Sequence, residues 1–190
     1  MNKAIFLDRD GTINVDKGYV HKIKDFQYID GVIEALKLFT TLGYIIIVVT
    51  NQSGIARGYY TDKDLEKLNK WMISDLREKG VVVSKVYYCP HLPEAIIWEY
   101  RLNCQCRKPK TGLFWKAKQE FDINMSNSYA IGDKMRDLAI CKETDIKGIL
   151  LKSKNELYMK TSIKDNIVIC NNLLQAANLI WKRDKGKNDE

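Results

Sequence analysis

Short apolar runs alternate with amphipathic segments along most of the chain, and this alternation restricts the fold more than any other feature of the sequence. Residues 4–7 are all apolar, and residues 45–49 form a continuous run of β-branched side chains. Between them, residues 31–42 carry apolar side chains at helical spacing and are followed by Gly43, a residue typical of a helix end. Strands that helices cover on both faces need such apolar runs. We therefore expect a parallel sheet with helices on its faces.

The same alternation continues beyond the second strand. Residues 61–80 predict a helix that opens with Thr61 and Asp64, an approximate capping box, and keeps one face apolar. The further expected elements are strands over residues 81–88, 128–131, 148–151 and 167–169, and helices over residues 111–121, 138–144 and 173–181. This order is typical of a doubly wound, mainly parallel, Rossmann-like α/β sheet, in which ligands bind beyond the carboxyl ends of the strands.

The size and composition fit one globular domain over residues 1–190. Of the 190 residues, 45% are hydrophobic and 29% are charged, and a core of this size needs no disulfide bonds. The basic stretch near the C-terminus, about residues 183–190, is interpreted as a flexible, solvated tail. No apolar run reaches the roughly 18 to 20 residues of a membrane span, and residues 1–3 lead into a strand rather than a signal peptide. We expect a cytoplasmic protein without a membrane partner.

The net charge of +7 is compatible with an anionic small substrate, with nucleic acid, or with solubility alone. The sequence has no stripe of arginine and aromatic residues and no zinc-finger spacing that would favour nucleic acid. We therefore expect no nucleic-acid partner.

Polar residues follow the expected strands at the points where the chain leaves the sheet. Asp8 and Asp10 follow the first strand, Thr50 and Asn51 follow the second, and Asp133 follows the strand at residues 128–131. The first two carboxylates can converge on one cation, because the pleat no longer separates them beyond the strand end. The third carboxylate arrives from a neighbouring strand. Oxygen ligands of this kind suit Mg²⁺, which usually shares its coordination shell with a phosphate.

A second group of candidate metal ligands contains three cysteines and one histidine. Two short pairs separated by twelve residues supply them: Cys89, His91, Cys104 and Cys106. Four ligands of this kind fit a closed, tetrahedral, structural Zn²⁺ site, which would staple the loop at residues 89–106. The other two cysteines, Cys141 and Cys170, lie among apolar residues and are interpreted as buried side chains.

The motifs at the strand ends resemble those of one superfamily. The chain carries Asp-x-Asp-Gly-Thr after the first strand, Thr-Asn after the second, a downstream lysine, and Gly-Asp-x-x-x-Asp after a later strand. This pattern covers nearly the whole chain and resembles the haloacid dehalogenase superfamily of phosphatases. Within it, the chain resembles the heptose-1,7-bisphosphate 7-phosphatases, with the histidinol-phosphate phosphatases as close relatives. The segments that carry this narrower resemblance are FLDRDGTIN, VDKGYVH, FQYIDGV, VVTNQSGIARG, YYCPHLP, CQCRKPKTG and AIGDKMRD.

The resemblance implies a Mg²⁺-dependent phosphatase without a large cap domain, which removes the 7-phosphate of a heptose 1,7-bisphosphate through an aspartyl-phosphate. Asp8 is then the expected nucleophile and Asp10 the general acid and base. Thr50 and Lys108 would contact the transferring phosphoryl group. The expected Mg²⁺ ligands are Asp8, the backbone carbonyl of Asp10, and Asp133. Asp137 is expected to orient the site.

The candidate substrate contacts lie on loops around these residues. They are Asp16, Lys17, Gly18, Tyr19, Asn51, Gln52, Ser53, Arg107 and Lys134. Arg107 is expected to bind the phosphate that stays on the sugar, because a planar guanidinium binds phosphate oxygens bidentately. The zinc loop leads directly into Arg107 and Lys108 and would position both of them.

Three other interpretations remain open. A histidinol-phosphate phosphatase is the first, and a polynucleotide 3′-phosphatase, supported only by the basic charge, is the second; the latter needs an open channel with basic and stacking residues. The third, a catalytically silent zinc-stapled binding module, is expected to lack at least one of Asp8, Asp10, Lys108 and Asp133, and all four are present. The resemblance further implies a monomer that acts in heptose nucleotide-sugar biosynthesis, for example for lipopolysaccharide.

Overall fold

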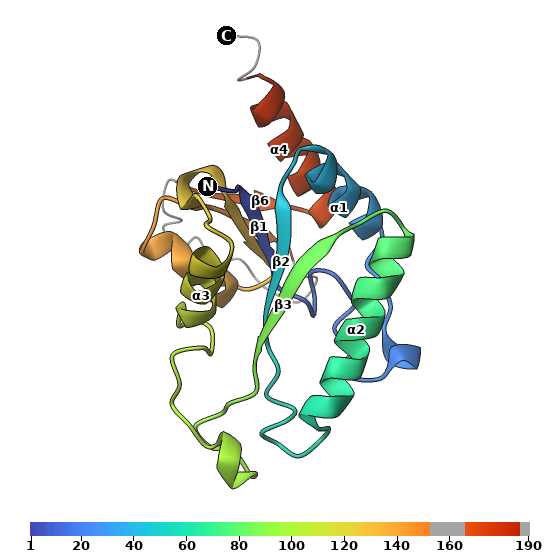
Figure 1. Cartoon of the computed structure of the whole chain (residues 1–190), viewed down its shortest axis with the longest axis vertical. Coiled ribbons are helices and arrows are strands. Elements are labelled where there is room, and N and C mark those ends of the chain that lie inside the picture. Colours follow the sequence, from blue (N-terminus) through green and yellow to red (C-terminus); the bar gives the residue numbers. More distant parts are fainter. Residues whose placement is uncertain (153–165, 187–190) are drawn as a thin grey trace.

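A parallel sheet runs through the centre of the structure, a computed structural model that describes residues 1–152 and 166–186 (Figure 1). Its strands are β1 (Ala4–Leu7), β2 (Ile45–Asn51), β3 (Val83–Cys89), β4 (Tyr129–Gly132), β5 (Lys147–Leu151) and β6 (Ile167–Cys170). Their order across the sheet is β3-β2-β1-β4-β5-β6, and all neighbouring pairs are parallel. This order confirms the expected doubly wound sheet. The order reverses between β1 and β4, so the carboxyl ends of these two strands flank the crevice where such folds bind ligands.

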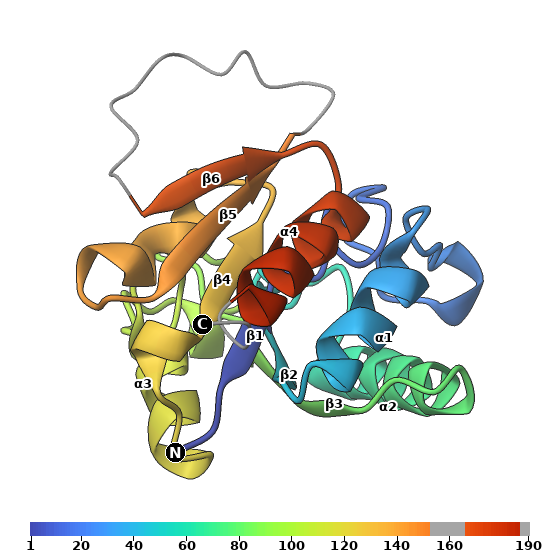
Figure 2. The ribbon, with the colours of Figure 1, turned by 90° about the horizontal axis from the view of Figure 1, so that it is seen from above.

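Helices cover both faces of the sheet (Figure 2). One face carries α1 (Val32–Thr41), α2 (Asp62–Glu78) and α4 (Leu173–Lys185), and the other carries α3 (Gly112–Glu120) and the 3₁₀-helix η4 (Met135–Lys142). Three shorter 3₁₀-helices are η1 (Ile23–Asp25), η2 (Trp98–Tyr100) and η3 (Met125–Asn127). None of the helices in the described ranges is long and apolar enough to cross a membrane.

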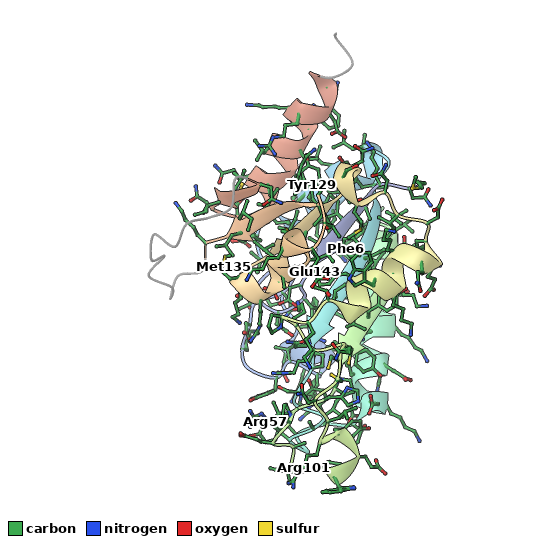
Figure 3. All side chains as sticks on the ribbon, turned by 90° about the vertical axis from the view of Figure 1, so that its left-hand side faces the viewer. Phe6, Arg57, Arg101, Tyr129, Met135 and Glu143 are labelled. Atoms are coloured by element: carbon green, nitrogen blue, oxygen red, sulfur yellow. The ribbon has the colours of Figure 1, made fainter. Side chains whose placement is uncertain are left out.

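The side chains of β1 alternate between the two core layers. Ile5 and Leu7 lie in the layer of α1 and α4, whereas Phe6 lies in the layer of α3. Phe6, labelled in Figure 3, packs against Phe114 of α3 with ring centroids 5.2 Å apart. Burial on both faces explains why this strand contains no polar residue, and why the first polar residues after it mark the edge of the sheet.

The capping box expected at the start of α2 is present. The Asp64 N–H donates to Thr61 Oγ1 over 3.2 Å, and the Thr61 N–H donates to the Asp64 carboxylate over 2.9 Å. The buried face of α2 contains Leu65, Leu68 and Met72 among others. The capping box therefore fixes the start of this helix directly after the loop that follows β2.

The C-terminal region corrects one expectation. Helix α4 continues to Lys185, so the expected flexible tail does not begin at residue 183; residues 187–190 lie outside the described part of the chain. The cause is Asp184, which accepts hydrogen bonds from Lys3 over 2.9 Å and from the Tyr44 hydroxyl over 3.0 Å. One residue of a charged run that looks solvated in the sequence, Asp184, is thus bonded to the amino-terminal end of the sheet, while its neighbours Lys182, Arg183 and Lys185 are exposed.

Two element boundaries also differ from the expected ones. The helix expected over residues 138–144 is the 3₁₀-helix η4, which begins at Met135, and the third strand is shifted to Val83–Cys89. Cys141 and Cys170 are buried as expected.

Candidate active site

Three carboxylates meet at the crevice between β1 and β4. Asp8 follows β1, Asp133 follows β4, and Asp137 lies in η4; each offers an oxygen within 4.8 Å of the other two. The two strand ends are held in register, because the Asp8 N–H donates to the Ile131 carbonyl over 3.1 Å. All three side chains are buried. The sheet topology therefore brings Asp8 together with two acidic groups that lie more than a hundred residues further along the sequence.

The buried ammonium group of Lys108 balances this charge. Its Nζ lies 2.9 Å from Asp8 Oδ1 and 2.7 Å from Asp137 Oδ1, and it also donates to the Val49 carbonyl over 2.6 Å. Burial disfavours the charged forms of Asp8 and Lys108, but their mutual attraction outweighs this effect. Lys108 therefore lowers the pKa of Asp8, and the carboxylates raise the pKa of Lys108. Asp8 is therefore held in its ionised, nucleophilic form.

Asp133 is compensated less than Asp8, because its one ion pair among the described residues is the 3.6 Å contact of Oδ2 with Lys134. Its Oδ1 is buried without a hydrogen-bond partner in the described ranges. Burial, together with the charges of Asp8 and Asp137, outweighs the nearby Lys134 and raises the pKa of Asp133 to about 6. An unpaired buried acceptor among oxygen ligands fits a hard divalent cation such as Mg²⁺.

Gly11 leaves room for this carboxylate. Gly11 has a φ of +83°, and a Cβ there would lie 2.5 Å from Asp133 Oδ2. The glycine of the Asp-x-Asp-Gly-Thr segment therefore permits both the left-handed turn and the close approach of Asp133 to the loop after β1.

Asp10 is held by three neighbouring donors. Arg9 Nη2 lies 2.9 Å from Asp10 Oδ2, Asn14 Nδ2 lies 3.0 Å from Oδ1, and Gln52 Nε2 lies 2.9 Å from Oδ2. Arg9 is fully buried and also donates to the Val20 carbonyl over 2.6 Å. The same guanidinium thus fixes Asp10 and the end of the loop at residues 16–20.

The loop after β2 contributes side chains to the site around Asp10. Gln52 donates to Thr50 Oγ1 over 3.0 Å, so the Thr50 side chain lies beside Asp10. Asn51 exchanges two 3.0 Å hydrogen bonds with the backbone N–H and carbonyl of Lys108, which fixes the loop that carries this lysine.

A cavity of about 350 Å³ opens onto these groups. Its lining consists of Asp8, Asp10, Asp16, Gly18, Tyr19, Thr50, Asn51, Gln52, Ser53, Tyr60, Arg107, Lys108, Lys134 and Arg136. Every candidate substrate contact is among them except Lys17, which is exposed. Asp16 and Lys134 approach each other to 3.7 Å and connect two of the surrounding loops.

The four candidate zinc ligands also come together, at the end of β3. The sulfur atoms of Cys104 and Cys106 lie 3.0 Å apart, and those of Cys89 and Cys104 lie 3.5 Å apart. Nδ1 of His91 lies 3.2 Å from the Cys106 sulfur. A tetrahedron with Zn–S bonds of about 2.3 Å has edges of about 3.8 Å, so the four ligand atoms would move slightly apart around the ion. The donor set therefore fits the Zn²⁺ expected from the sequence.

Comparison with known proteins agrees with this geometry. The profile of the family described as Polynucleotide kinase 3 phosphatase matches residues 3–172. The D-glycero-beta-D-manno-heptose-1,7-bisphosphate 7-phosphatase of Haemophilus ducreyi is 45% identical over 169 residues, which cover 88% of this chain and 92% of that protein. The protein of the same name from Escherichia coli K12 is 50% identical over 135 residues, 71% of each chain. The chain belongs to the heptose-1,7-bisphosphate 7-phosphatase family.

Solved structures place this family member in the haloacid dehalogenase superfamily. The D,D-heptose 1.7-bisphosphate phosphatase from B. bronchiseptica, complexed with magnesium and phosphate, superposes with a TM-score of 0.83 and 26% identity, covering 95% of this chain and 99% of that one. A had-like phosphatase from Mesorhizobium loti gives a TM-score of 0.83 and 27% identity, covering 97% and 87%.

For this member of the heptose-1,7-bisphosphate 7-phosphatase family, sequence reasoning missed three residues of the site. Arg136 lines the cavity. It lies between Lys134 and Asp137 in the segment after β4, and this position could have identified it as a site residue from the sequence. Arg9 and Tyr60 have no such signal, because a buried arginine and a buried phenol are recognisable only from their partners in space.

Proposed function

We propose that the protein is a Mg²⁺-dependent phosphatase that removes the 7-phosphate of D-glycero-D-manno-heptose 1,7-bisphosphate and leaves the 1-phosphate. The observation that carries the proposal is the buried 2.9 Å ion pair of Asp8 with Lys108 at a cavity that Arg107, Lys134 and Arg136 also line. Such a site offers a nucleophile for one phosphate and several cations for a second. The names of the curated relatives support the same substrate.

The first step transfers the phosphoryl group to Asp8. An Asp8 carboxylate oxygen attacks phosphorus, the bond between phosphorus and the C7 oxygen breaks, and Asp10 donates a proton to that oxygen. Thr50 and Lys108 hold the phosphoryl oxygens during the transfer. The neighbouring donors of Asp10 keep its carboxyl group in one orientation beside the reacting atoms.

The second step regenerates the enzyme. Asp10 takes a proton from a water molecule, the water oxygen attacks phosphorus, and the bond to Asp8 breaks to release inorganic phosphate. Asp8, the backbone carbonyl of Asp10, and Asp133 would hold Mg²⁺, which neutralises the phosphate charge when bound. Asp137 keeps Lys108 in place through their 2.7 Å ion pair.

The cations around the cavity distinguish the candidate substrates. Histidinol phosphate carries a cationic amine, which Arg107, Lys134 and Arg136 would repel, whereas a bisphosphate places a second anion there. A 3′-phosphorylated polynucleotide, the substrate that the family profile suggests, needs an open channel with stacking residues. The cavity of about 350 Å³, which the loops around Asp16 and Arg107 line, suits a sugar better.

We further propose that Zn²⁺ at the Cys₃His cluster is structural and positions Arg107 and Lys108, which follow Cys106 directly. The proposed setting is heptose nucleotide-sugar biosynthesis in the cytoplasm, for example for lipopolysaccharide, with the protein acting as a monomer without a nucleic-acid partner.

A phosphate-release screen with Mg²⁺ tests the substrate. It compares heptose 1,7-bisphosphate, histidinol phosphate and DNA with a 3′-phosphate. The proposal predicts the highest kcat/KM for the heptose bisphosphate. A higher value for histidinol phosphate or for the DNA would replace it with the corresponding alternative.

A further inference from the structure

A buried glutamine connects Asp10 to a tyrosine on the next loop. Gln52 is only 2% exposed, and both ends of its amide group are bonded within the protein. Its Nε2 donates to Asp10 Oδ2 over 2.9 Å and to Thr50 Oγ1 over 3.0 Å, and its Oε1 accepts from the Tyr60 hydroxyl over 2.6 Å. The amide therefore donates to Asp10 with its nitrogen and accepts from Tyr60 with its oxygen.

The tyrosine hydroxyl determines which way the amide points. Burial raises the pKa of Tyr60 far above its ordinary value, so its hydroxyl remains protonated and donates. With Oε1 occupied by this hydroxyl, Nε2 must face Asp10. The reversed amide would place an oxygen against the Asp10 carboxylate and would lose the hydrogen bond that Tyr60 donates.

The ring of Tyr60 is fixed from several sides. A Cβ at Gly54 would lie 2.1 Å from the ring, so only glycine leaves the space that the ring occupies. The His21 ring stacks on the Tyr60 ring at a centroid distance of 4.7 Å and an angle of 11°. Ile55 and Leu65 complete a small buried cluster with Tyr60. The hydroxyl is thus held in position by packing as well as by its hydrogen bond.

The zinc-ligand loop supports the segment that carries Tyr60. The Ala56 carbonyl accepts hydrogen bonds from the N–H groups of both Ile96 and Ile97, each over 3.1 Å. In Figure 3 the labelled Arg57 and Arg101 lie at the same end of the molecule, far from Tyr129. The loops after β2 and β3 therefore form one unit around Tyr60.

We infer that Tyr60 is a positioning residue for the reaction, which acts through Gln52 to aim the Asp10 carboxyl group at the leaving oxygen. The inference rests on the proposed function, because it assumes that Asp10 is the general acid. Tyr60 itself need not touch the substrate. Its loss should slow proton transfer to the leaving group without weakening substrate binding.

The dependence on the leaving group tests this role. An alkyl phosphate such as the heptose bisphosphate needs a proton on its leaving oxygen, whereas p-nitrophenyl phosphate has a stable leaving anion and does not. For Tyr60→Phe, the first-turnover rate with the heptose bisphosphate should fall on the order of tenfold, the effect of one lost hydrogen bond. The KM for the bisphosphate and the first-turnover release of p-nitrophenol should stay within about twofold.

A second variant and a control complete the experiment. Gln52→Glu keeps an acceptor for Tyr60 but removes the amide donor to Asp10, and it should lower the same alkyl-phosphate rate at least as much as Tyr60→Phe does. Tyr44→Phe is the matched control, because Tyr44 and Tyr60 are both 6% exposed and Tyr44 donates to Asp184 at the opposite end of the sheet. It should leave both rates unchanged.

Each other outcome has one meaning. Equal losses with both phosphates in Tyr60→Phe would indicate general structural damage, and an unchanged rate with the alkyl phosphate would show that Tyr60 does not position Asp10; either overturns the inference. If the wild type does not hydrolyse the heptose bisphosphate, the proposed substrate fails instead. The same comparison then uses the alkyl phosphate that the enzyme does hydrolyse.

Discussion

Nζ of Lys108 lies 2.9 Å from Oδ1 of Asp8, although 100 residues separate them in the sequence. Both side chains are buried, and the same ammonium group also contacts Asp137. Removing the cation would leave three carboxylates close together in a site with little solvent. The pair therefore links the stability of the fold to the chemistry proposed for Asp8.

Lys108→Met should destabilise the protein and abolish its phosphatase activity. Breaking a buried ion pair by removing one partner typically costs about 3 to 5 kcal/mol, and urea unfolding of the metal-free protein measures this cost. Lys110→Met is the control, because Lys110 is only partly buried and its ammonium group bonds only to Asn103 among the described contacts. A Lys108→Met protein as stable as the control would contradict the proposed charge balance.

Cys104→Ser should remove the bound zinc and lower the melting temperature. Structural zinc contributes folding free energy, so elemental analysis of protein purified without added metal should find one Zn²⁺ per wild-type chain and less in the variant. Cys170→Ala, a change at a buried cysteine outside the cluster, should keep the metal. Full zinc content in a Cys104 and Cys106 double variant would place the ligands elsewhere.

Arg107→Ala should impair the bisphosphate selectively. Loss of a charged hydrogen bond to the retained phosphate should lower kcat/KM by about 1.5 to 3 kcal/mol in transition-state terms, with little effect on p-nitrophenyl phosphate. Arg101→Ala provides a comparison, since Arg101 bonds to the Ala95 carbonyl and does not line the cavity. Equal losses with both substrates would instead assign Arg107 to the reacting phosphate.

The stabilising effect of Mg²⁺ should depend on pH through Asp133. The pKa of Asp133 in the folded protein, about 6, lies above its ordinary value of 3.8, so its ionisation opposes folding in the absence of metal. The contribution of this group to stability therefore falls as pH rises from about 4 through about 6, and a cation that binds the ionised form reverses this loss.

Melting temperatures measure this effect. Mg²⁺ should raise the melting temperature more at about pH 7.5 than at about pH 5, where protons compete for Asp133. In Asp133→Asn most of this difference should disappear. A Mg²⁺ effect in that variant as large as in the wild type would exclude Asp133 as a ligand.

The sequence was sufficient to predict the sheet and the residues at its carboxyl edge. Strands buried on both faces need apolar runs, so the first polar residues after each run, such as Asp8 and Asp133, had to lie at the edge of the sheet. The Cys₃His cluster was predictable for a similar reason, because its short spacings carry their own chemistry.

The remaining contacts depend on side-chain partners that no local pattern reveals. Arg9 is charged and adjacent to two acids, yet it is fully buried, and its Nη2 donates to Asp10 and to the Val20 carbonyl. Gln52 was expected to contact substrate and does line the cavity, but nothing in the sequence indicates that its amide also joins Asp10 to Tyr60. Asp184 is a further example, because the bonds that hold the last turn of α4 come from Lys3 and Tyr44, which are far from it in the sequence.

The most direct test of the proposed function is ³¹P NMR of the reaction with heptose 1,7-bisphosphate and Mg²⁺, with Asp8→Asn as the inactive reference. The account predicts that the resonance of the C7 phosphate disappears as inorganic phosphate forms, while the phosphate at C1 persists. In Asp8→Asn both sugar resonances should remain, because the nucleophile is lost. Loss of the C1 phosphate, or turnover by Asp8→Asn at the wild-type rate, would contradict it.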